Sequence, residues 1–191
     1  FACEHENVEP DLMCLGKGLS GGYLPLAATL ATDEVAEAFE GEPHEHRTLY
    51  HGHTYTGNPL GCAAALASLR LFDENDLLES VRRKATVAAE WLEPLRDPDR
   101  FAWVVDVRQR GLMVGIELSA DGTAATGFDP SRPLGAAVTD ACRKAGLIIR
   151  PLGNVVVLMP PLSIDEAELR SMIQLVLDQI ERLPENAVSN T

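Results

Sequence analysis

Apolar positions follow two different spacings along the chain, and the spacing changes near residue 57. Before that point, short apolar runs alternate with glycine, proline and histidine, a pattern typical of strands and loops built around a site. Between Leu60 and Leu92 the apolar residues instead recur every three to four positions. This periodicity predicts amphipathic helices.

The boundaries of these helices carry signals of their own. Asn58 is a good N-cap, and Pro59 suits the first helical position, where a missing N–H costs nothing. The polar run at 73–76 predicts a break or a bend, after which a second amphipathic helix follows. Pro94 is expected to end that second helix.

The C-terminal half of the chain predicts an α+β arrangement. Alternation with a period of two at 105–107 and 112–118 predicts two strands joined by a short turn. Two further apolar runs, 147–150 and 155–159, predict a second strand pair with 153–154 in its turn.

Two helices and a loop complete this half. One helix is predicted over 133–145 and ends at Gly146, a natural residue for a left-handed C-cap. In the other, Ser163 and Glu166 predict a capping box ahead of an apolar face. The residues at 119–132 are rich in Ser, Gly, Thr, Asp and Pro and predict a surface loop.

Composition limits the partners of the protein. The chain has 191 residues, 46% of them hydrophobic, and a formal charge of −13 at pH 7. Nucleic acid and anionic membranes repel so negative a protein, so neither is expected as a partner, and no apolar run is long enough to span a membrane. The cysteines are widely spaced, which predicts buried thiols in a reducing cytoplasm instead of a disulfide framework; they are Cys3, Cys14, Cys62 and Cys142.

One lysine is set among glycines at 15–22, LGKGLSGG, directly after an apolar run. A lysine amine reacts with an aldehyde only when it is held beside the ligand and largely desolvated, so that the neutral nucleophile is populated. Glycines let the backbone approach a flat ligand closely, which makes Lys17 a candidate for such a bond. The alternatives are a solvated surface turn and a phosphate loop, but the latter needs Ser or Thr where Gly18 stands.

A second candidate site lies at 51–59, HGHTYTGNP, just ahead of the predicted helix start. The free N–H groups of a helix N-terminus favour negative charge, and the Thr54 hydroxyl beside a flexible glycine is suited to bind a phosphate. The alternative is that Thr54 and Thr56 only satisfy backbone groups of a turn.

The histidines raise the question of a metal site. His44 and His46 stand two positions apart, and so do His51 and His53. Zinc requires three or four ligands, and no third ligand follows at a recognisable spacing. We therefore predict no metal site.

Arg150 follows an apolar run and stands apart from other charges. A guanidinium in such a place can make a paired, planar contact with the carboxylate of a ligand. The alternative is a structural salt bridge with one of the many acidic residues. Arg108 and Arg110 are expected to pair with acids or to cover a strand edge.

The segment at 10–26, PDLMCLGKGLSGGYLPL, resembles the cofactor-lysine segment of class III pyridoxal-phosphate aminotransferases. The resemblance covers nearly the whole chain and includes FACEHEN at 1–7, HGHTYTGN at 51–58, and RPLG at 150–153 ahead of LMPPL at 158–162. It implies an α/β fold, the fold type I of pyridoxal-phosphate-dependent transferases.

The same resemblance implies the domain organisation. Residues 1–72 would form the C-terminal part of the cofactor-binding large domain, 73–100 a connecting helical segment, 101–184 a small α+β domain and 185–191 a tail. Because Phe1 matches the middle of the family's proteins, the chain is expected to be a C-terminal fragment.

The resemblance also implies roles for individual residues. Lys17 would be catalytic and hold pyridoxal 5′-phosphate, and Thr54 would contact the cofactor phosphate of the neighbouring subunit, which implies a homodimer. Arg150 would bind a substrate carboxylate. His53, which stands where some relatives have proline, is expected to contact the cofactor, and Gly52 the substrate.

Within the family, these segments look most like the aminotransferases of biotin synthesis. Those enzymes convert 8-amino-7-oxononanoate to 7,8-diaminononanoate, with S-adenosylmethionine or lysine as amino donor. The alternatives are an ω-amino acid:pyruvate or diamine aminotransferase and a non-catalytic assembly domain that keeps the fold. Because much of the family's cofactor pocket would precede Phe1, the chain alone is expected to be inactive and to bind the cofactor poorly.

Overall fold

A computed structural model describes residues 1–119 and 133–183. The chain divides into two compact units, Phe1–Asn75 and Asp76–Thr191. The loop predicted at 119–132 and the tail predicted at 185–191 lie, apart from Ser119, outside the described residues.

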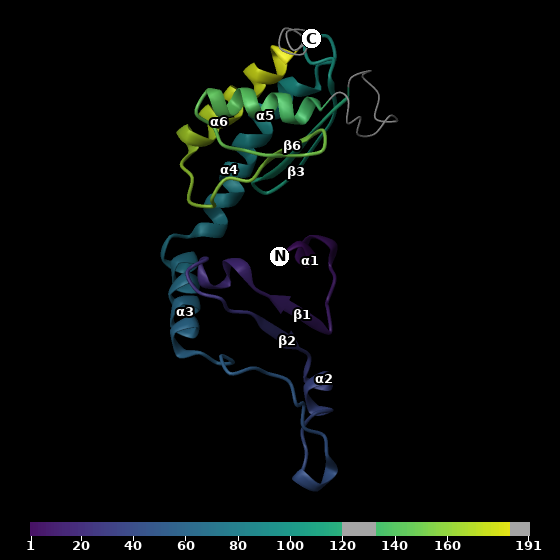
Figure 1. Cartoon of the computed structure of the whole chain (residues 1–191), viewed down its shortest axis with the longest axis vertical. Coiled ribbons are helices and arrows are strands. Elements are labelled where there is room, and N and C mark those ends of the chain that lie inside the picture. The colour runs from purple at the N-terminus through teal and green to yellow at the C-terminus, as the bar shows by residue number, and fades with distance from the viewer. Residues whose placement is uncertain (120–132, 184–191) are drawn as a thin grey trace. The chain divides into compact units, whose positions relative to one another are not determined.

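The first unit consists of short elements followed by one long helix (Figure 1). The strands β1 and β2 pair in antiparallel fashion, with Leu12 opposite Ala31 and Leu15 opposite Ala28. The unit's elements are α1 (Ala2–Glu6), β1 (Leu12–Leu15), the 3-10 helix η1 (Lys17–Ser20), β2 (Ala28–Ala31), α2 (Asp33–Glu37), the 3-10 helix η2 (Pro43–Glu45) and α3 (Pro59–Glu74).

Helix α3 begins and ends where the sequence predicts. The Asn58 side chain accepts a hydrogen bond from Leu60 N at 2.9 Å, and Pro59 is the first helical residue. The helix ends at Glu74. Shortly after it, Asp76 has a positive φ of 45°, which does not occur within an α-helix.

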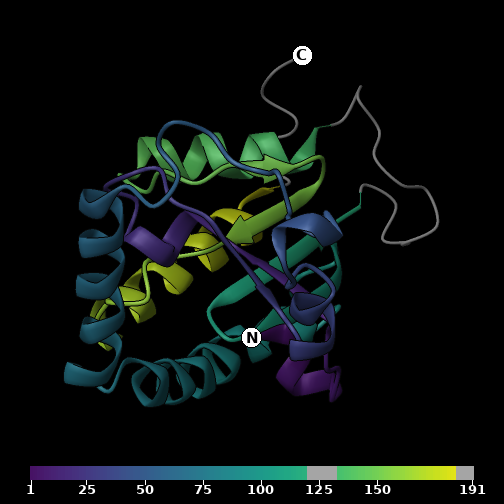
Figure 2. The same cartoon turned by 90° about the horizontal axis from the view of Figure 1, so that it is seen from below.

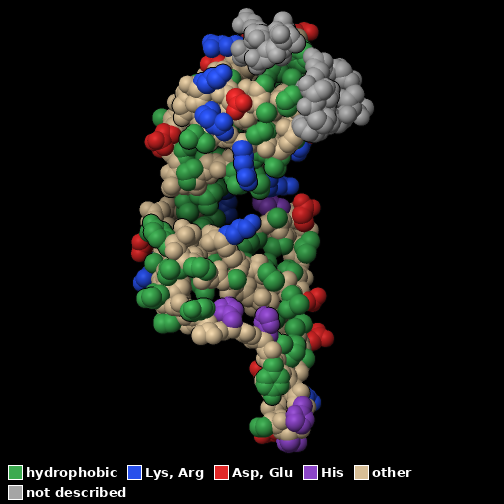
Figure 3. Space-filling view, in the orientation of Figure 1, with side chains coloured by type: hydrophobic (Ala, Val, Ile, Leu, Met, Phe, Trp, Pro, Cys, Tyr) green, Lys and Arg blue, Asp and Glu red, His purple; other side chains and the backbone are tan. Residues whose placement is uncertain are grey.

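The first unit buries almost no apolar surface of its own. Its buried residues are Ser20, Gly61 and Ala65. Figure 3 shows hydrophobic side chains open on the visible face of this unit. Its exposed large hydrophobic residues are Phe1, Val8, Leu12, Tyr23, Leu24, Leu30, Phe39, Leu49, Tyr50, Tyr55, Leu60, Leu66, Leu69 and Leu71.

The second unit is built around a four-stranded antiparallel sheet with the strand order β3-β4-β6-β5. Helices α5 and α6 pack against each other, as Figures 1 and 2 both show, and α4 packs on α6. The unit's elements are α4 (Leu77–Leu92), the 3-10 helix η3 (Glu93–Arg96), β3 (Val104–Arg110), β4 (Met113–Leu118), α5 (Leu134–Lys144), β5 (Pro151–Leu152), β6 (Val155–Leu158) and α6 (Glu166–Glu181).

One face of this sheet is buried, and the other is more exposed. Alternation along β4 and β6 places Ile116 and Val156 in a single core with Ile173 of α6. On the opposite face, Arg108 pairs with acidic side chains. The core is therefore continuous from α4 to the end of α6.

Lys84 of α4 is a buried cation in this unit. Its ammonium group donates hydrogen bonds to the carbonyl oxygens of Leu162, at 2.6 Å, and Ile164, at 2.9 Å. These bonds satisfy the charge and tie the segment before α6 to α4.

Three predicted details of this half are wrong. The first strand continues through 108–110, where the sequence predicted the turn, and ends at Arg110. Residues 147–150 form no strand, since only Pro151 and Leu152 pair with β6 across the predicted turn. The cap of α6 is Asp165 instead of Ser163: the Asp165 carboxylate accepts a hydrogen bond from Glu168 N at 2.7 Å. Asp caps as well as Ser does, so the later of the two signals fixed the helix start.

The thiols are also more exposed than predicted. All four cysteines are free, as expected, but Cys14 and Cys62 are exposed and only Cys142 is buried. Within the described part of the chain, no helix is long and apolar enough to cross a membrane.

Candidate active site

Lys17 is the first residue of η1, and only Gly16 separates it from the end of β1. Its backbone adopts a φ of +50°, an uncommon conformation for a residue with a side chain. The desolvation expected from the sequence is not provided by this chain, because Lys17 is exposed. Its ammonium group has no hydrogen-bond or ion-pair partner among the described residues.

Helix α3 holds the segment that carries Lys17. Gly61 and Ala65 present a face without bulky side chains, and a Cβ at Gly61 would contact Leu26 at 3.5 Å. Ser68, on the same helix, donates a hydrogen bond to the Gly18 carbonyl at 3.4 Å. The small residues of α3 thus let the segment at 16–26 approach closely.

The turn at 53–58 is closed by hydrogen bonds between its own residues. The His53 backbone N–H donates to Thr56 Oγ1 at 2.9 Å, and Thr56 N donates to the His53 carbonyl at 2.9 Å. In addition, Tyr55 N donates to the imidazole Nδ1 of His53 at 3.1 Å. The turn ends at Asn58, the cap of α3, so one helix anchors both this turn and the Lys17 segment.

The two threonines of this turn differ. The Thr56 hydroxyl accepts the hydrogen bond of the His53 N–H, which is the turn role that the sequence offered as the alternative to phosphate binding. The Thr54 hydroxyl, in contrast, has no hydrogen-bond partner among the described residues and is exposed. Thr54 therefore remains available for a ligand.

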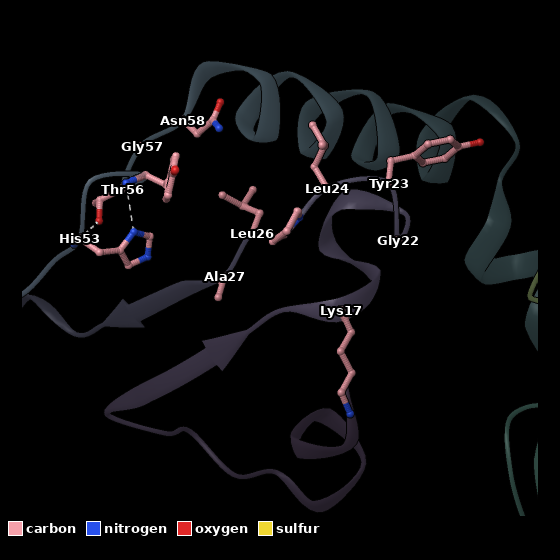
Figure 4. A pocket seen from close by; sticks show the side chains of 12 residues that line it. Lys17, Gly22, Tyr23, Leu24, Leu26, Ala27, His53, Thr56, Gly57 and Asn58 are labelled. Carbon is pink, nitrogen blue, oxygen red and sulfur yellow. Dashed lines mark hydrogen bonds between the residues drawn. The ribbon is translucent and has the colours of Figure 1, made fainter.

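A hollow of about 960 Å³ lies between these segments within the first unit. Figure 4 shows Lys17 at its edge, with a side chain that extends away from His53 and Thr56. Gly52 and Thr54 do not line this hollow, and a Cβ at Gly52 would contact Thr56 Oγ1 at 3.4 Å. The residues that line it are Lys17, Gly22, Tyr23, Leu24, Pro25, Leu26, Ala27, His53, Tyr55, Thr56, Gly57 and Asn58.

The sequence analysis did not predict that the segment at 22–27 lines this hollow. The run GYLPLA could have indicated it, because a glycine and a proline there flank large apolar residues. In the structure Gly22 has a φ of +81° and Tyr23 is exposed. Ser20 shapes the same segment by donating a hydrogen bond to the Leu24 carbonyl.

Arg150 lies in the second unit, on an extended segment next to β5. The side chains alternate along this segment: Leu147 and Ile149 pack on the core, whereas Ile148 and Leu152 are 82% and 65% exposed. Arg150 is exposed with them and has no ion pair among the described residues. The salt-bridge alternative thus finds no support in residues 1–119 and 133–183.

The turn between β5 and β6, next to Arg150, packs closely against α5. A Cβ at Gly135 would overlap the Gly153 carbonyl oxygen, and Gly135 N donates a hydrogen bond to the buried Asn154 side chain at 3.4 Å. Such close packing leaves the hairpin little freedom to shift.

The other arginines singled out in the sequence are paired. Arg108 Nη1 lies 2.6 Å from Asp106 Oδ2 and 2.7 Å from Glu117 Oε2, and these hydrogen bonds raise the pKa of its guanidinium. Arg110 also has an interaction partner.

No group of three or more His, Cys, Asp or Glu residues in the described ranges could hold a metal ion. His44 lies on η2 and His46 directly after it, whereas His53 lies in the turn ahead of α3. The two histidine pairs therefore do not converge with acidic or thiol ligands in the described part of the chain.

Comparison with known proteins places the chain in a family. The model of the family described as Aminotransferase class-III matches residues 1–180. The chain is 50% identical over 186 residues to an adenosylmethionine-8-amino-7-oxononanoate aminotransferase of Nitratidesulfovibrio vulgaris, a match that covers 97% of this chain and 34% of the relative.

Solved structures agree with this match. The aminotransferase of the same name from Methanocaldococcus jannaschii is 43% identical, with a TM-score of 0.85, over 95% of this chain and 42% of that one. An (S)-enantioselective omega-transaminase from Thermomicrobium roseum is 32% identical, with a TM-score of 0.81, over 96% of this chain and 40% of that one. The chain thus spans 34% to 42% of the length of these proteins. Because the family model matches most of its residues, the chain belongs to the class III aminotransferases.

Proposed function

We propose that the complete protein is a pyridoxal-phosphate-dependent transaminase of biotin synthesis, which converts 8-amino-7-oxononanoate to 7,8-diaminononanoate in the cytoplasm. The observation that carries the proposal is Lys17, an unpartnered amine held on a left-handed backbone and anchored through its neighbour Gly18 to α3. The relatives that carry the name of this activity, at 43% and 50% identity, support the substrate.

The residues present fit pyridoxal 5′-phosphate. Lys17 offers an amine for its aldehyde, and Thr54, ahead of the N-terminus of the 16-residue helix α3, offers a free hydroxyl for its phosphate. When bound, the cofactor supplies an electron sink for the substrate carbon. Lys17 then acts as a base and an acid, moving the proton at the substrate carbon that carries the amine.

The geometry supports a homodimer in which Lys17 and Thr54 serve different cofactor molecules. The Lys17 side chain extends away from His53 and Thr56 (Figure 4). Thr54 is not among the residues that line the hollow. A single chain therefore does not direct both groups at one ligand. In the proposed dimer, Thr54 binds the phosphate held in the neighbouring subunit.

Arg150 supports a substrate with a carboxylate at the end of an aliphatic chain. Its free guanidinium stands between the exposed Ile148 and Leu152 on the outward side of one extended segment. A guanidinium binds a carboxylate in a paired, planar contact, and the flanking side chains offer apolar contact to methylene groups. The substrate 8-amino-7-oxononanoate has both features.

A second candidate is an ω-amino acid:pyruvate or diamine aminotransferase of the same family. The similarity to the omega-transaminase from Thermomicrobium roseum favours it, because that similarity covers 96% of the chain. Both candidates use Lys17 in the same way and differ only in the substrates that the site accepts.

The complete protein tests the proposal by chemical trapping. Reduction with borohydride is expected to leave the cofactor on the peptide that contains Lys17, and Lys17→Ala is expected to lose the label and the transamination of every donor. Lys144→Ala, which removes an exposed lysine on α5, is the matched control and should retain both. A label retained by Lys17→Ala would refute the proposal.

Substrate assays then separate the two candidates. The biotin-pathway assignment predicts turnover of 8-amino-7-oxononanoate with S-adenosylmethionine or lysine as donor. Turnover of ω-amino acids with pyruvate, without turnover of the oxononanoate, would establish the second candidate instead. The 191-residue chain alone is expected to be inactive in both assays, and activity there would contradict the expected need for the rest of the protein.

A further inference from the structure

The turn that carries Thr54 depends on an imidazole for one of its hydrogen bonds. Tyr55 N donates to His53 Nδ1, and the backbone of His53 is bonded through both its N–H and its carbonyl to Thr56. These bonds act on the residues on either side of Thr54, so they fix the peptide groups that flank it.

The hydrogen bond from Tyr55 also determines which ring nitrogen carries the proton. Nδ1 can accept only when it is unprotonated, so the neutral imidazole carries its proton on Nε2. The acceptor is thus the nitrogen nearer the backbone. A side chain with an acceptor only at the Nε2 position would leave the Tyr55 N–H without this partner.

We propose that His53 is a positioning residue, whose Nδ1 holds the turn in the shape that presents the Thr54 hydroxyl to the phosphate ester of the cofactor. This inference rests on the proposed function, in which Thr54 binds that phosphate. Without the Nδ1 acceptor, the turn samples more conformations, and ordering it on binding weakens the affinity for the phosphate. His53 therefore acts through Thr54 and not through contact with the cofactor ring.

The test compares two substitutions that place the acceptor differently. His53→Asn keeps a side-chain amide close to the position of Nδ1, whereas His53→Gln moves it toward the position of Nε2. The affinities of the complete apoprotein for pyridoxal 5′-phosphate and for pyridoxal, which lacks the phosphate, are measured for each variant. His51→Gln is the matched control, because the His51 ring has no hydrogen bond among the described residues.

We expect His53→Gln to weaken the affinity for pyridoxal 5′-phosphate by about three- to tenfold, the value of one exposed hydrogen bond. Its affinity for pyridoxal should change by less than about twofold, because the effect requires the phosphate. His53→Asn and His51→Gln should stay close to the native protein with both ligands. Thermal unfolding of each apoprotein variant checks that the fold is retained.

Three results would overturn the inference. The first is that His53→Gln leaves both affinities unchanged, and the second is that it lowers the affinities for both ligands equally. The third is that His53→Asn lowers the affinity for pyridoxal 5′-phosphate as much as His53→Gln does. Thr54→Val, which removes the hydroxyl and keeps the shape, separates this failure from that of the proposed function. If Thr54→Val weakens phosphate binding but His53→Gln does not, only the inference fails. If Thr54→Val has no effect, the proposed role of Thr54 and the inference fail together, whereas Lys17 trapping still tests the enzymatic assignment.

Discussion

Both units of the chain contain helices and strands, but the two units differ in how much side-chain surface they bury. In the second unit, every helix of eight or more residues and the described sheet contribute to one core, within which Ile173 is 1% exposed. In the first unit, the only buried residues are Ser20, Gly61 and Ala65, and Leu66 on the long helix α3 is 61% exposed. The two units thus differ in packing as well as in the length of their elements.

This contrast shows which interactions hold the residues of the candidate site in place. Lys17 and the turn at 53–58 belong to the unit that buries little of its own surface, and local hydrogen bonds to α3 hold them. Burial of apolar area is the main driving force of folding, and the exposed leucines and tyrosines of the first unit do not contribute to it.

Separating the units gives the largest expected effect. Residues 76–191, made alone, should unfold cooperatively with a free energy of about 5 kcal/mol or more, whereas residues 1–75 alone should show no cooperative transition. Urea titrations followed by circular dichroism measure both. A sharp transition in residues 1–75 would show that the first unit is stable without a core, and the comparison would not hold.

A matched pair of truncations sharpens the contrast inside the intact chain. Ile173→Ala removes a fully buried side chain of α6 and should lower the free energy of unfolding by about 2–5 kcal/mol. Leu66→Ala removes an exposed side chain of α3 and should change it by less than about 0.5 kcal/mol. The urea midpoint of the 191-residue chain reports both, and equal losses would contradict the difference in packing.

Two glycines test the same contrast by adding a methyl group. At Gly135 a Cβ would overlap the Gly153 carbonyl, so Gly135→Ala should destabilise the second unit by about 1–3 kcal/mol despite the better helix propensity of alanine. At Gly18 no atom lies within 4 Å of the added Cβ. Gly18→Ala should therefore leave the thermal midpoint close to that of the native chain, and a large drop there would reveal tight packing around η1.

A surface ion pair gives the smallest expected effect. Arg100 binds Glu181 through two hydrogen bonds of 2.7 and 2.9 Å, which lower the pKa of the Glu181 carboxyl. A lowered pKa means that the pair stabilises the fold above the ordinary carboxyl pKa of about 4.3, and that this stabilisation disappears as the pH falls through the pKa of the folded state. Glu181→Gln should thus lower the thermal midpoint slightly at neutral pH.

The control for this pair is the same measurement in acid. Once the carboxyl of the native chain is protonated, the native chain and the Glu181→Gln variant should unfold at the same temperature. A difference that persists in acid would assign the effect to packing around α6 instead of to charge.

The helices could be predicted from the sequence because their signals are local. Periodicity located α3, α4 and α6, and the Asn58 and Pro59 pair marked the start of α3 to the residue. The same reasoning failed at 147–150, where an apolar run forms no strand because no neighbouring strand pairs with it. Pairing is a tertiary property that a run of β-branched residues does not encode.

For the candidate site, the sequence indicated residue types and segments but not their contacts. Glycines around Lys17 and the turn residues after Gly52 indicated two segments that line one hollow, yet only the structure distinguishes the bonded Thr56 from the unpaired Thr54. The exposure of Lys17 could not be anticipated, because desolvation depends on chain segments far away in sequence or on another subunit.

The four free thiols differ in exposure, so their reactivity can report the unfolding of the second unit. Burial raises the pKa of the Cys142 thiol to about 11, so this group resists alkylation while α5 stays packed. Cys14 and Cys62, both in the first unit, are exposed and free. Alkylating reagents should therefore modify those two at once in the native chain and reach Cys142 only when the second unit unfolds, so mass spectrometry can time its opening without an added probe.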